Sequence, residues 1–467
     1  MGPAARRLVI VSNRGPYRRE GGQVRGRLVR AAGGLVSALD PVLGRRGGVW
    51  VSGDSIEAAD DKDGARPETR YKLCGVELPK PVQTGYYDGF SNAVLWPLLH
   101  GFSTTIRLSE APWNHYARAN HAFAEQVLTH SRPEDLIWVQ DYHLMLLPRI
   151  IRAARPKTRT GWFCHVPWPH PETFRVLPWR TALLEGLLGA DVLGFHTQRF
   201  TRNFLACVHE LTDHSVDFTR GTIDVHGRVV QAATAPIGID TEAVTALARQ
   251  AEVCAETERI RSLVGGRRII LGVDRLDYTK GIVERLLAYE SFLKQERDAA
   301  ARCVYVQVMV PSRTDVRAYK ELKREIDRLV GDINGRFAST GRIPVHYFFR
   351  NLNLHSLYAH YRAADIALVT PLRDGMNLVA HEYVTARTRD DGALILSEFA
   401  GAATYLDTAY RINPYDIWAI RGALVEALRQ KPAEEARRMA ALRSAVKRLD
   451  VHRWAAAYLD LLDAGAA

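Results

Sequence analysis

The sequence predicts an α/β protein of two domains, each built on a parallel sheet, and three observations lead to this prediction. Short apolar runs alternate with stretches of helical periodicity along the chain, which is typical of βαβ units with parallel strands. The alternation stops at ATAPIGID (233–240) and then starts again. The length of 467 residues is also more than a single hydrophobic core usually serves.

In the N-terminal half, four apolar runs with polar boundaries predict strands. They cover residues 8–13, 136–141, 160–167 and 191–196. Helical periodicity is found in residues 122–130, 143–155, 180–190 and 201–211. The break in the pattern places a domain boundary near residue 238, so we expect residues 1–237 to form the first domain.

The C-terminal half repeats the rhythm. Strands are predicted at residues 267–274, 303–310, 345–349, 365–371 and 392–398, and helices at 281–296 and 315–333. Two further helical stretches, 432–449 and 451–463, have no strand between them. We therefore expect residues 238–450 to form the second domain and residues 451–467 to pack back on the first.

The composition is that of an ordinary globular protein, with 47% hydrophobic and 25% charged residues. No apolar run is long enough to span a membrane, and the N-terminal stretch does not read as a secretory signal. The five scattered cysteines form no CxxC pair, which favours a reducing cytoplasm over a disulfide framework. The net charge of +11 is compatible with nucleic acid binding, but the positive residues are spread along the chain. An acidic small-molecule substrate, or simply an arginine-rich proteome, explains the excess as well.

The stretch ILGVDRLDYTKGI (270–282) places charges directly after a predicted buried strand. Arg275 and Lys280 lie where a helix begins. In open α/β sheets this edge binds ligands, and a helix N-terminus there favours an anion. Two cations at this point predict a binding site for a strongly negative group such as a diphosphate. A solvated loop of paired charges is the alternative interpretation.

The segment VTPLRDGMNLVAHEY (369–383) has a similar form. A strand ends near Pro371, and a turn follows before helical spacing begins. The main-chain N–H groups after Asp374 could bind an oxyanion, namely those of Gly375, Met376 and Asn377. Asp374 suits sugar hydroxyls, and Glu382, two helical turns further on, suits a ribose. A helix cap with a surface glutamate is the alternative.

The N-terminal half offers weaker signals. Gly33 and Gly34 precede a helix, which permits close approach of a phosphate. A basic loop leads to them, with Arg14, Arg18, Arg19, Arg25, Arg27 and Arg30. Further polar residues end strands: Asp141, Tyr142 and His143 in one case and His165 in another. A histidine at such a position is more often packed than catalytic.

Residues 86–100 read as an aromatic-rich loop. Core packing is the default interpretation, and stacking of Tyr87 or Trp96 on a sugar is the alternative. We expect no metal site and no cofactor. The DKD at 61–63 has no strand leading into it, and the sequence has no HExxH and no GxxxxGK[ST] motif.

The chain resembles the α,α-trehalose-phosphate synthases, retaining glucosyltransferases of the GT-B fold, in which two Rossmann-like domains face each other across a cleft. The resemblance runs from about residue 7 to about 460. It is carried by SNR (12–14), GG (33–34), FSNAVLWP (90–97), DYH (141–143), H-V-P (165–167), DRLDYTKG (274–281), SRTDV (312–316), INGRF (333–337) and PLRDGMNLVAHEY (371–383).

The resemblance implies an activity: transfer of glucose from UDP-, GDP- or ADP-glucose to glucose 6-phosphate without a metal. It implies that the second domain binds the nucleotide sugar and the first binds the acceptor. A homo-oligomer is an expectation as well. Implied donor-site residues are Gly33, Gly34, Arg275, Lys280, Leu357, Asp374, Gly375, Met376, Asn377, Leu378, Val379 and Glu382. Implied acceptor-site residues are Arg14, Tyr87, Trp96, Asp141, Tyr142 and Arg313, and the residues at the reacting centre are His165, Arg275, Lys280 and Asp374.

One motif departs from the family pattern. The family has W-x-G-W after the first helix, whereas this chain reads VWVSGDS (49–55), with Trp50 at the first tryptophan and Gly53 at the second. The wall that touches the acceptor sugar is therefore expected to be less filled. Transfer to glycerol 3-phosphate, coupling of cyclitols, and a non-catalytic regulatory role are the remaining alternatives, although Arg275, Lys280 and Glu382 are all present.

Overall fold

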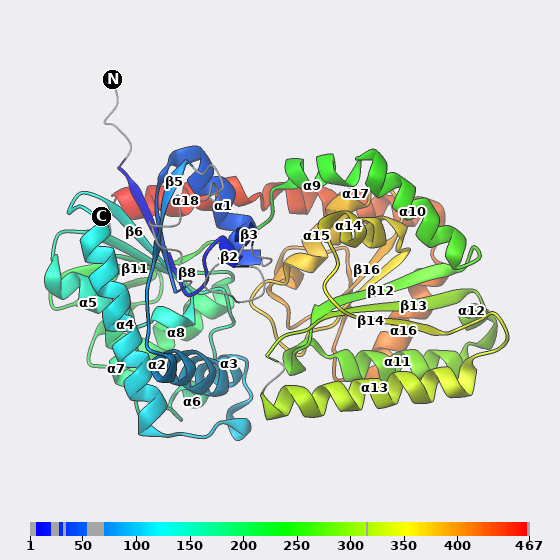
Figure 1. Cartoon of the computed structure of the whole chain (residues 1–467), viewed down its shortest axis with the longest axis horizontal. Helices are drawn as coiled ribbons and strands as arrows, with labels where there is room; N and C mark the ends of the chain where they lie inside the picture. Colours follow the sequence, from blue (N-terminus) through cyan, green and yellow to red (C-terminus); the bar gives the residue numbers. More distant parts are fainter. Residues whose placement is uncertain (1–5, 20–27, 31–33, 54–69, 314–315, 465–467) are drawn as a thin grey trace. The chain divides into compact units, whose positions relative to one another are not determined.

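The computed structural model describes residues 6–19, 28–30, 34–53, 70–313 and 316–464 (Figure 1). The chain forms two compact units. Unit 1 comprises Met1–Ile237 and Val451–Ala467, and unit 2 comprises Gly238–Asp450. Among the described residues, none of the helices combines the length and apolarity needed to span a lipid bilayer.

The described part of unit 1 is built on a nine-stranded sheet of order β5-β4-β1-β6-β7-β8-β11-β10-β9. Its strands are β1 (Leu8–Ser12), β4 (Gly48–Ser52), β5 (Tyr71–Gly75), β6 (Leu136–Gln140), β7 (Arg159–Phe163), β8 (Val192–Phe195), β9 (Ser215–Asp217), β10 (Thr222–Val225) and β11 (Arg228–Thr234). In this spatial order, the seven strands from β5 through β11 pair in parallel with their neighbours. Strands β10 and β9 add an antiparallel edge next to β11. The sheet grows outward in both directions from β1 and its neighbour β6.

Helices surround this sheet. They are α1 (Gly34–Arg46), α2 (Lys80–Thr84), η3 (Gly85–Leu95), α3 (Trp96–Leu99), η4 (Ser103–Thr105), α4 (Glu110–His130), η5 (Tyr142–Leu144), α5 (Leu147–Ala154), α6 (Pro171–Phe174), α7 (Arg180–Leu187), α8 (Gln198–Leu211) and α18 (Val451–Ala464). Residues 86–100, expected to be a loop, form the π-helix η3 and the helix α3 instead. Core packing, the default interpretation of the aromatic side chains in this segment, is confirmed for Tyr86 and Phe90, which are completely buried.

The part of the chain expected to be a basic loop contains a short hairpin. Strands β2 (Tyr17–Arg19) and β3 (Leu28–Arg30) pair in antiparallel register. Arg25, Arg27 and Gly33 lie outside the described residues.

The last helix of the chain packs on the sheet of unit 1. The hydroxyl of Tyr458 in α18 donates to the carbonyl oxygens of Trp162 in β7 and Val192 in β8, each at 2.9 Å. Its ring stacks on that of Trp138 in β6, with centroids 4.8 Å apart. Residues 451–464 therefore complete the core of unit 1 across three neighbouring strands.

The described part of unit 2 has a six-stranded parallel sheet of order β14-β13-β12-β15-β16-β17. The strands are β12 (Arg268–Arg275), β13 (Cys303–Val310), β14 (Val345–Phe349), β15 (Ile366–Val369), β16 (Ala393–Ser397) and β17 (Tyr410–Ile412). The helices are α9 (Thr241–Ala248), α10 (Ala251–Leu263), η6 (Tyr278–Lys280), α11 (Ile282–Gln295), α12 (Arg297–Ala301), α13 (Arg317–Phe337), α14 (Leu354–Ala363), α15 (Leu378–Ala386), η7 (Gly401–Thr404), α16 (Ile417–Arg429) and α17 (Pro432–Arg448). This is the doubly wound Rossmann order, and the direction of winding reverses between β12 and β15.

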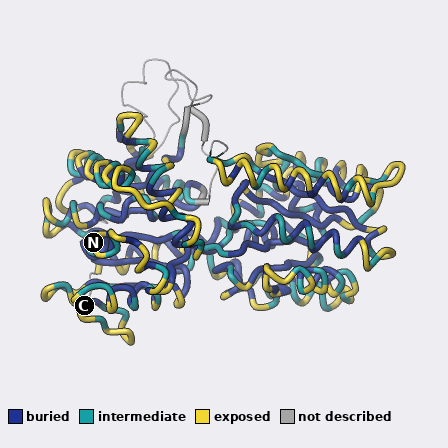
Figure 2. Tube along the Cα trace, turned by 90° about the horizontal axis from the view of Figure 1, so that it is seen from below, coloured by how far each residue is buried: buried dark blue, intermediate teal, exposed yellow. Residues whose placement is uncertain are grey.

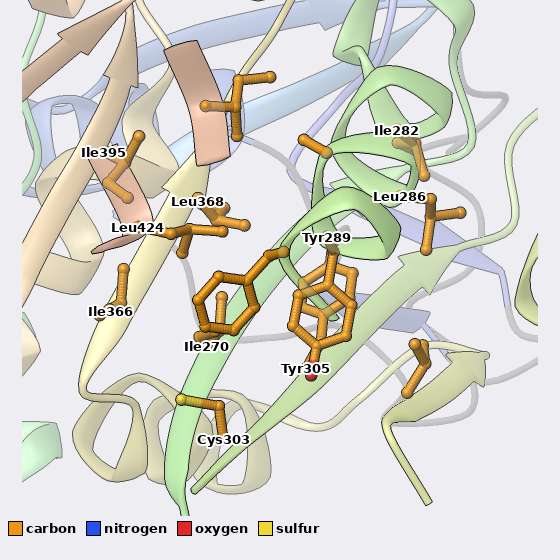
Figure 3. Packing of buried hydrophobic residues seen from close by; sticks show 14 of the residues in the cluster. Ile270, Ile282, Leu286, Tyr289, Cys303, Tyr305, Ile366, Leu368, Ile395 and Leu424 are labelled. Atoms are coloured by element: carbon orange, nitrogen blue, oxygen red, sulfur yellow. The ribbon is translucent and has the colours of Figure 1, made fainter. Parts of the chain in front are cut away.

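The inner strands of unit 2, β12, β13, β15 and β16, are mostly buried, whereas its helices expose their outer faces (Figure 2). In the core, Ile270 of β12 and Leu368 of β15 pack with the rings of Tyr289 and Tyr305 (Figure 3). Those two rings lie 5.2 Å apart. Because these side chains pack tightly, the carboxyl ends of β12 and β15 are held rigidly, and the polar residues that follow them share one edge of the sheet.

Candidate active site

In unit 2, two polar loops meet at the reversal point of the sheet. The loop after β12 carries Lys280, and the loop after β15 carries Asp374. The ammonium Nζ of Lys280 lies 2.5 Å from Oδ2 of Asp374, and both side chains are mostly buried. The main chain joins the loops as well, since Leu372 N–H donates to Thr279 O at 2.7 Å. The structure thus brings together two residues that the sequence assigned to one site.

Gly281 allows the first loop to lie this close to the second. Its φ is 63°, in the left-handed region. A Cβ at this position would lie 2.2 Å from the carbonyl oxygen of Thr370. Only glycine therefore fits both the conformation and the space. Its position fixes Lys280 immediately before the N-terminus of α11.

A buried arginine that the sequence did not single out supports both loops. Arg285 is completely buried and pairs with Asp274, with Nη1 2.6 Å from Oδ2. Its other nitrogens donate to Thr370 Oγ1 at 2.9 Å and to the carbonyl oxygen of Lys280 at 3.2 Å. Since Asp274 is the penultimate residue of β12 and Thr370 follows β15, Arg285 ties the two strand ends to the backbone of Lys280.

The turn before α15 presents a row of main-chain donors. Asn377 has a positive φ of 74°, which turns the chain into the helix. Within the described part of the chain, no hydrogen bond uses the N–H groups of Gly375, Met376, Asn377, Leu378 or Val379. Consecutive unpaired N–H groups at a helix N-terminus form an anion-binding feature. The sequence predicts this role for Gly375, Met376 and Asn377, and it stays a prediction.

Glu382 lies further along α15 and is held by α14. Its Oε2 accepts a hydrogen bond from the hydroxyl of Tyr361 at 2.9 Å. Burial raises the pKa of Glu382 to about 7, and the hydrogen bond from Tyr361 offsets part of the rise. Leu357, expected near a nucleotide base, lies half-buried on the same helix as Tyr361. Tyr361 was missed by sequence reasoning because nothing in a helical pattern indicates which tyrosine meets a glutamate.

Arg313 belongs to a second charged cluster in unit 2. Its guanidinium donates to the hydroxyl of Tyr319 at 2.5 Å and lies 3.7 Å from Oδ2 of Asp277. Burial alone would raise the pKa of Asp277, but the positive charges of Arg313, Arg275 and Lys280 outweigh it and hold the pKa below its usual value. Arg275 itself is exposed at the end of β12. Asp277 therefore links the loop of Lys280 to Arg313.

Unit 1 also gathers its predicted residues where the winding of its sheet reverses. Arg14 follows β1, and Asp141 follows the adjacent strand β6. The guanidinium of Arg14 donates to the hydroxyl of Tyr87 at 2.7 Å. The ring of Tyr87 stacks on His143, with centroids 5.7 Å apart and an interplanar angle of 11°. The exposed guanidinium of Arg14 is therefore held by Tyr87, whose ring packs on that of His143.

Tyr142 and Trp96 are the buried members of this group. The hydroxyl of Tyr142 donates to Oδ1 of Asn92 at 3.0 Å, and its ring centroid lies 5.8 Å from that of Trp96. Both side chains are buried, with Trp96 6% exposed. Asn92, which lies on η3, was not among the residues expected at the site.

His165 lies half-buried after β7, next to two residues of the β6 loop. Its Nε2 is 2.9 Å from Oε1 of Gln140, and its main-chain N–H donates to Oδ1 of Asp141 at 3.1 Å. Burial lowers the pKa of His165 well below its ordinary value, and the nearby His196 lowers it further. Gln140 was not predicted as a site residue, because the sequence places it inside a buried strand.

Gly53, at the position of the second family tryptophan, lies close to the main chain of Asn13. It follows β4, and its N–H donates to the carbonyl oxygen of Asn13 at 3.1 Å. A Cβ here would lie 2.9 Å from that oxygen and 3.3 Å from the ring of Phe123. A side chain at position 53 would therefore require a shift of the local main chain, and the expectation of a less filled acceptor wall stays a prediction. Trp50, at the first tryptophan of the family motif, is buried, and its indole N–H donates to Ser12 Oγ at 2.8 Å. The predicted Gly34 is the first residue of α1.

Comparison with known proteins gives a consistent result. The model of glycosyltransferase family 20 matches residues 6–464. A trehalose-6-phosphate synthase of Mycobacterium sp. (strain KMS) is 42% identical over 447 residues, which is 93% of this chain and 90% of that protein.

Solved structures agree. An α,α-trehalose-phosphate synthase (UDP-forming) from Burkholderia xenovorans, in complex with glucose-6-phosphate, superposes with a TM-score of 0.89 at 33% identity, covering 98% of this chain and all of that one. An E. coli structure bound with UDP-2-fluoro glucose gives a TM-score of 0.88 at 33% identity and covers 98% of each chain. The family match spans nearly the whole chain, and the structural neighbours are GT-B trehalose-phosphate synthases. This chain belongs to glycosyltransferase family 20.

Proposed function

We propose that this enzyme transfers glucose, with retention of configuration, from a nucleoside-diphosphate glucose to glucose 6-phosphate, forming α,α-trehalose 6-phosphate. The observation that carries the proposal is the arrangement at the reversal point of unit 2, where Lys280, Asp374 and five consecutive N–H groups adjoin. An anion grip beside a sugar-binding carboxylate is what a nucleotide sugar requires. The names of the family-20 relatives support the same reaction.

We assign the donor to unit 2. Arg275, Lys280 and the N–H groups of residues 375–379 bind the diphosphate, and Gly34 is assigned to the same group. Asp374 binds hydroxyls of the glucose, and His165 meets its 6-hydroxyl. Glu382 binds the ribose through Oε1, which makes no hydrogen bond to any described residue while Oε2 is held by Tyr361. Leu357 lines the pocket for the base.

The chemistry is electrostatic. As the bond from the sugar to the diphosphate breaks, negative charge grows on the leaving oxygen, and Arg275 and Lys280 stabilise it. No pair of carboxylates in the described part of the chain stands out for double displacement. We therefore infer that the acceptor hydroxyl attacks from the face that the diphosphate leaves, and that the diphosphate takes its proton.

We assign the acceptor to Arg14, Tyr87, Trp96, Asp141 and Tyr142 of unit 1, with Arg313 assigned to its phosphate. Arg14 supplies a second cation for that phosphate, since an exposed guanidinium can form charge-assisted hydrogen bonds with it. Asp141 accepts hydrogen bonds from sugar hydroxyls. Transfer to glycerol 3-phosphate, cyclitol coupling and a purely regulatory role are not favoured by the comparisons.

For the nucleotide we propose UDP. Two of the solved neighbours are described with UDP chemistry, one as UDP-forming and one with bound UDP-2-fluoro glucose.

The experiment is a panel of UDP-, GDP- and ADP-glucose against glucose 6-phosphate, glucose and glycerol 3-phosphate at equal concentration. Released diphosphate is measured, and the product linkage is read by NMR. We expect UDP-glucose and glucose 6-phosphate to be preferred and the product to be α,α-linked. Preference for glycerol 3-phosphate, or equal use of free glucose, would overturn the acceptor assignment.

A further inference from the structure

Gln140, the last residue of β6, makes a defined contact with His165. Its side chain is completely buried, and its Oε1 lies 2.9 Å from Nε2 of His165. Its Nε2 donates to the carbonyl oxygen of Trp138 at 3.4 Å. Because a carbonyl oxygen only accepts hydrogen bonds, the amide nitrogen of Gln140 faces Trp138, and the amide oxygen is left to face His165. The nitrogen of His165 at this contact must therefore carry the hydrogen.

The residue after Gln140 holds the main chain of His165. Consecutive side chains of a strand point to opposite faces of the sheet. At Asp141 the chain leaves this pattern, with a φ of 71°. The Oδ1 of Asp141 accepts the N–H of His165 at 3.1 Å. Two adjacent residues thus hold both the ring and the backbone of one histidine.

Aromatic side chains from three elements surround the imidazole ring. The centroid of His165 lies 4.9 Å from that of Phe163, 5.4 Å from His196 after β8, and 6.1 Å from Trp454 of α18. Such packing restricts rotation of the ring, so the contact with Gln140 is kept.

We propose that Gln140 is a positioning residue that fixes His165 as the Nε2–H tautomer and so presents its Nδ1 as a hydrogen-bond acceptor. The inference extends the proposed function, in which His165 meets the donor sugar. Nδ1 makes no hydrogen bond to any described residue. In a neutral imidazole with its hydrogen on the buried Nε2, Nδ1 can accept a hydrogen bond, and a sugar hydroxyl can donate one.

Because the partner of His165 Nε2 is a neutral amide, it adds no negative charge that would favour protonation of the imidazole. Burial and His196 already lower the pKa of His165. The carboxylate of Asp141 accepts the main-chain N–H of His165, and α18 contributes the uncharged ring of Trp454. A glutamate in place of Gln140 would put a carboxylate on Nε2 and favour the imidazolium, which has no acceptor nitrogen.

The direct test is NMR of the full chain labelled with ¹⁵N-histidine, with the signals of His165 identified by their loss in His165→Phe. We expect a pyridine-type Nδ1 and a pyrrole-type Nε2 from pH 8 down to pH 6. Gln140→Glu should give an imidazolium at pH 6 to 7, and Gln140→Leu should give a mixture of tautomers. Gln231→Leu removes a glutamine of β11 whose amide nitrogen donates to three main-chain carbonyl oxygens, and it should change nothing.

A protonated Nδ1 in the wild-type chain, or an unchanged spectrum in Gln140→Leu, would overturn the proposal. Thermal unfolding checks that each variant folds, and using both Gln140 variants keeps the test decisive if one does not.

A kinetic comparison separates this inference from the proposed function. UDP-glucose is compared with UDP-6-deoxyglucose, which lacks the hydroxyl in question. We expect the wild type to prefer UDP-glucose about tenfold or more in kcat/KM, consistent with one lost hydrogen bond, and Gln140→Leu to lose most of that preference at an unchanged KM for the acceptor. If NMR shows the Nε2–H tautomer but the wild type does not prefer UDP-glucose over UDP-6-deoxyglucose, His165 does not meet the donor sugar. The role of Gln140 in orienting His165 would then still stand.

Discussion

Lys280 and Asp374 form an ion pair at 2.5 Å across 94 residues of sequence. Each follows one of the two strands between which the winding of the unit 2 sheet reverses. Asp374 also accepts a hydrogen bond from Asn377 Nδ2 at 3.0 Å. The carboxylate thus holds the lysine in place before a ligand arrives, so little reorganisation is needed when a diphosphate binds.

The first prediction concerns this cationic grip. Lys280→Ala or Arg275→Ala should each lower kcat roughly a hundredfold, about 3 kcal/mol, because the lost contact strengthens as charge develops on the leaving group. Steady-state kinetics with UDP-glucose and glucose 6-phosphate measure the effect. Lys294→Ala, which removes an exposed lysine of α11 paired with Glu290, is the matched control and should be near wild type. Turnover within about threefold of wild type in both site variants would remove the diphosphate assignment.

The second prediction concerns the buried pair of Arg285 and Asp274. Replacing Arg285 by Met leaves Asp274 charged and buried, and should lower the free energy of unfolding by about 3–5 kcal/mol. The double variant Arg285→Met with Asp274→Leu should recover part of that loss, because no unpaired charge remains. Chemical denaturation of both proteins measures the difference.

The activity of the double variant gives the second reading. Arg285 also donates to the backbone of Lys280, so kcat should stay low even where stability recovers. Full recovery of both would show that Arg285 serves stability alone.

The segments around the site could be predicted from sequence where their signals are local. The apolar run before Asp274 and the Pro371 to Asn377 turn identify strand ends, and strand ends at a reversal of winding bind ligands. Their partners could not be predicted in this way. Tyr361, Gln140 and Arg285 lie inside regular elements, and only the packing of one element on another shows which side chain they meet.

The same distinction explains where the expectations differ from the structure. Residues 86–100 were expected to be a loop with its aromatic side chains in the core. Tyr86, Phe90 and Trp96 are in the core, but the helices η3 and α3 carry them. At Gly53 the sequence shows only that a side chain is missing. Its closeness to the carbonyl oxygen of Asn13 arises because β1 and β4 are neighbours in the sheet, which no local pattern reveals.

The third prediction concerns the pH dependence of donor binding. Glu382 is an acid whose pKa is raised to about 7, so its ionised fraction falls as the pH drops through 7. Since the carboxylate accepts hydrogen bonds from ribose hydroxyls, UDP-glucose affinity should fall below this pH. Tyr361→Phe removes a hydrogen bond that lowers the pKa, and should move the midpoint to higher pH. Calorimetric titration from pH 5.5 to 8.5 measures both.

Glu382→Gln is the control for this assignment. It has no carboxyl group, so its donor affinity should be weaker but level across the same range. A wild-type affinity that does not change between pH 6 and 8 would mean that Glu382 does not bind the ribose in its ionised form.

The fourth prediction is that catalysis needs no divalent metal. The charge on the leaving diphosphate is met by Arg275, Lys280 and the N–H groups before α15, so excess EDTA should leave most of the activity. Initial rates with and without chelator, and after addition of Mg²⁺ or Mn²⁺, measure this. If EDTA abolishes the activity and one of these ions restores it, a metal ion stabilises the leaving diphosphate instead.

The last prediction concerns Arg313 and the acceptor. Its guanidinium lies 3.7 Å from Asp277 and donates to Tyr319, so it is held in a defined position. A phosphomonoester would form charge-assisted hydrogen bonds with it. Arg313→Ala should therefore raise the KM for glucose 6-phosphate about tenfold or more, with little change in donor affinity. Arg317→Ala removes an arginine that is 91% exposed at the start of α13, and it should leave that KM unchanged.

Asp277 makes this test sharper, because its pKa is held down in part by Arg313. Removing Arg313 leaves the buried carboxyl with less positive charge around it, which could disturb the neighbouring loop of Lys280. The variant Arg313→Ala with Asp277→Asn removes both charges and separates the two effects. If the KM for glucose 6-phosphate stays raised in the double variant while UDP-glucose affinity remains at the wild-type value, the phosphate contact is lost. If the acceptor KM returns to normal, Arg313 acts on the donor loop through Asp277 and does not bind the acceptor.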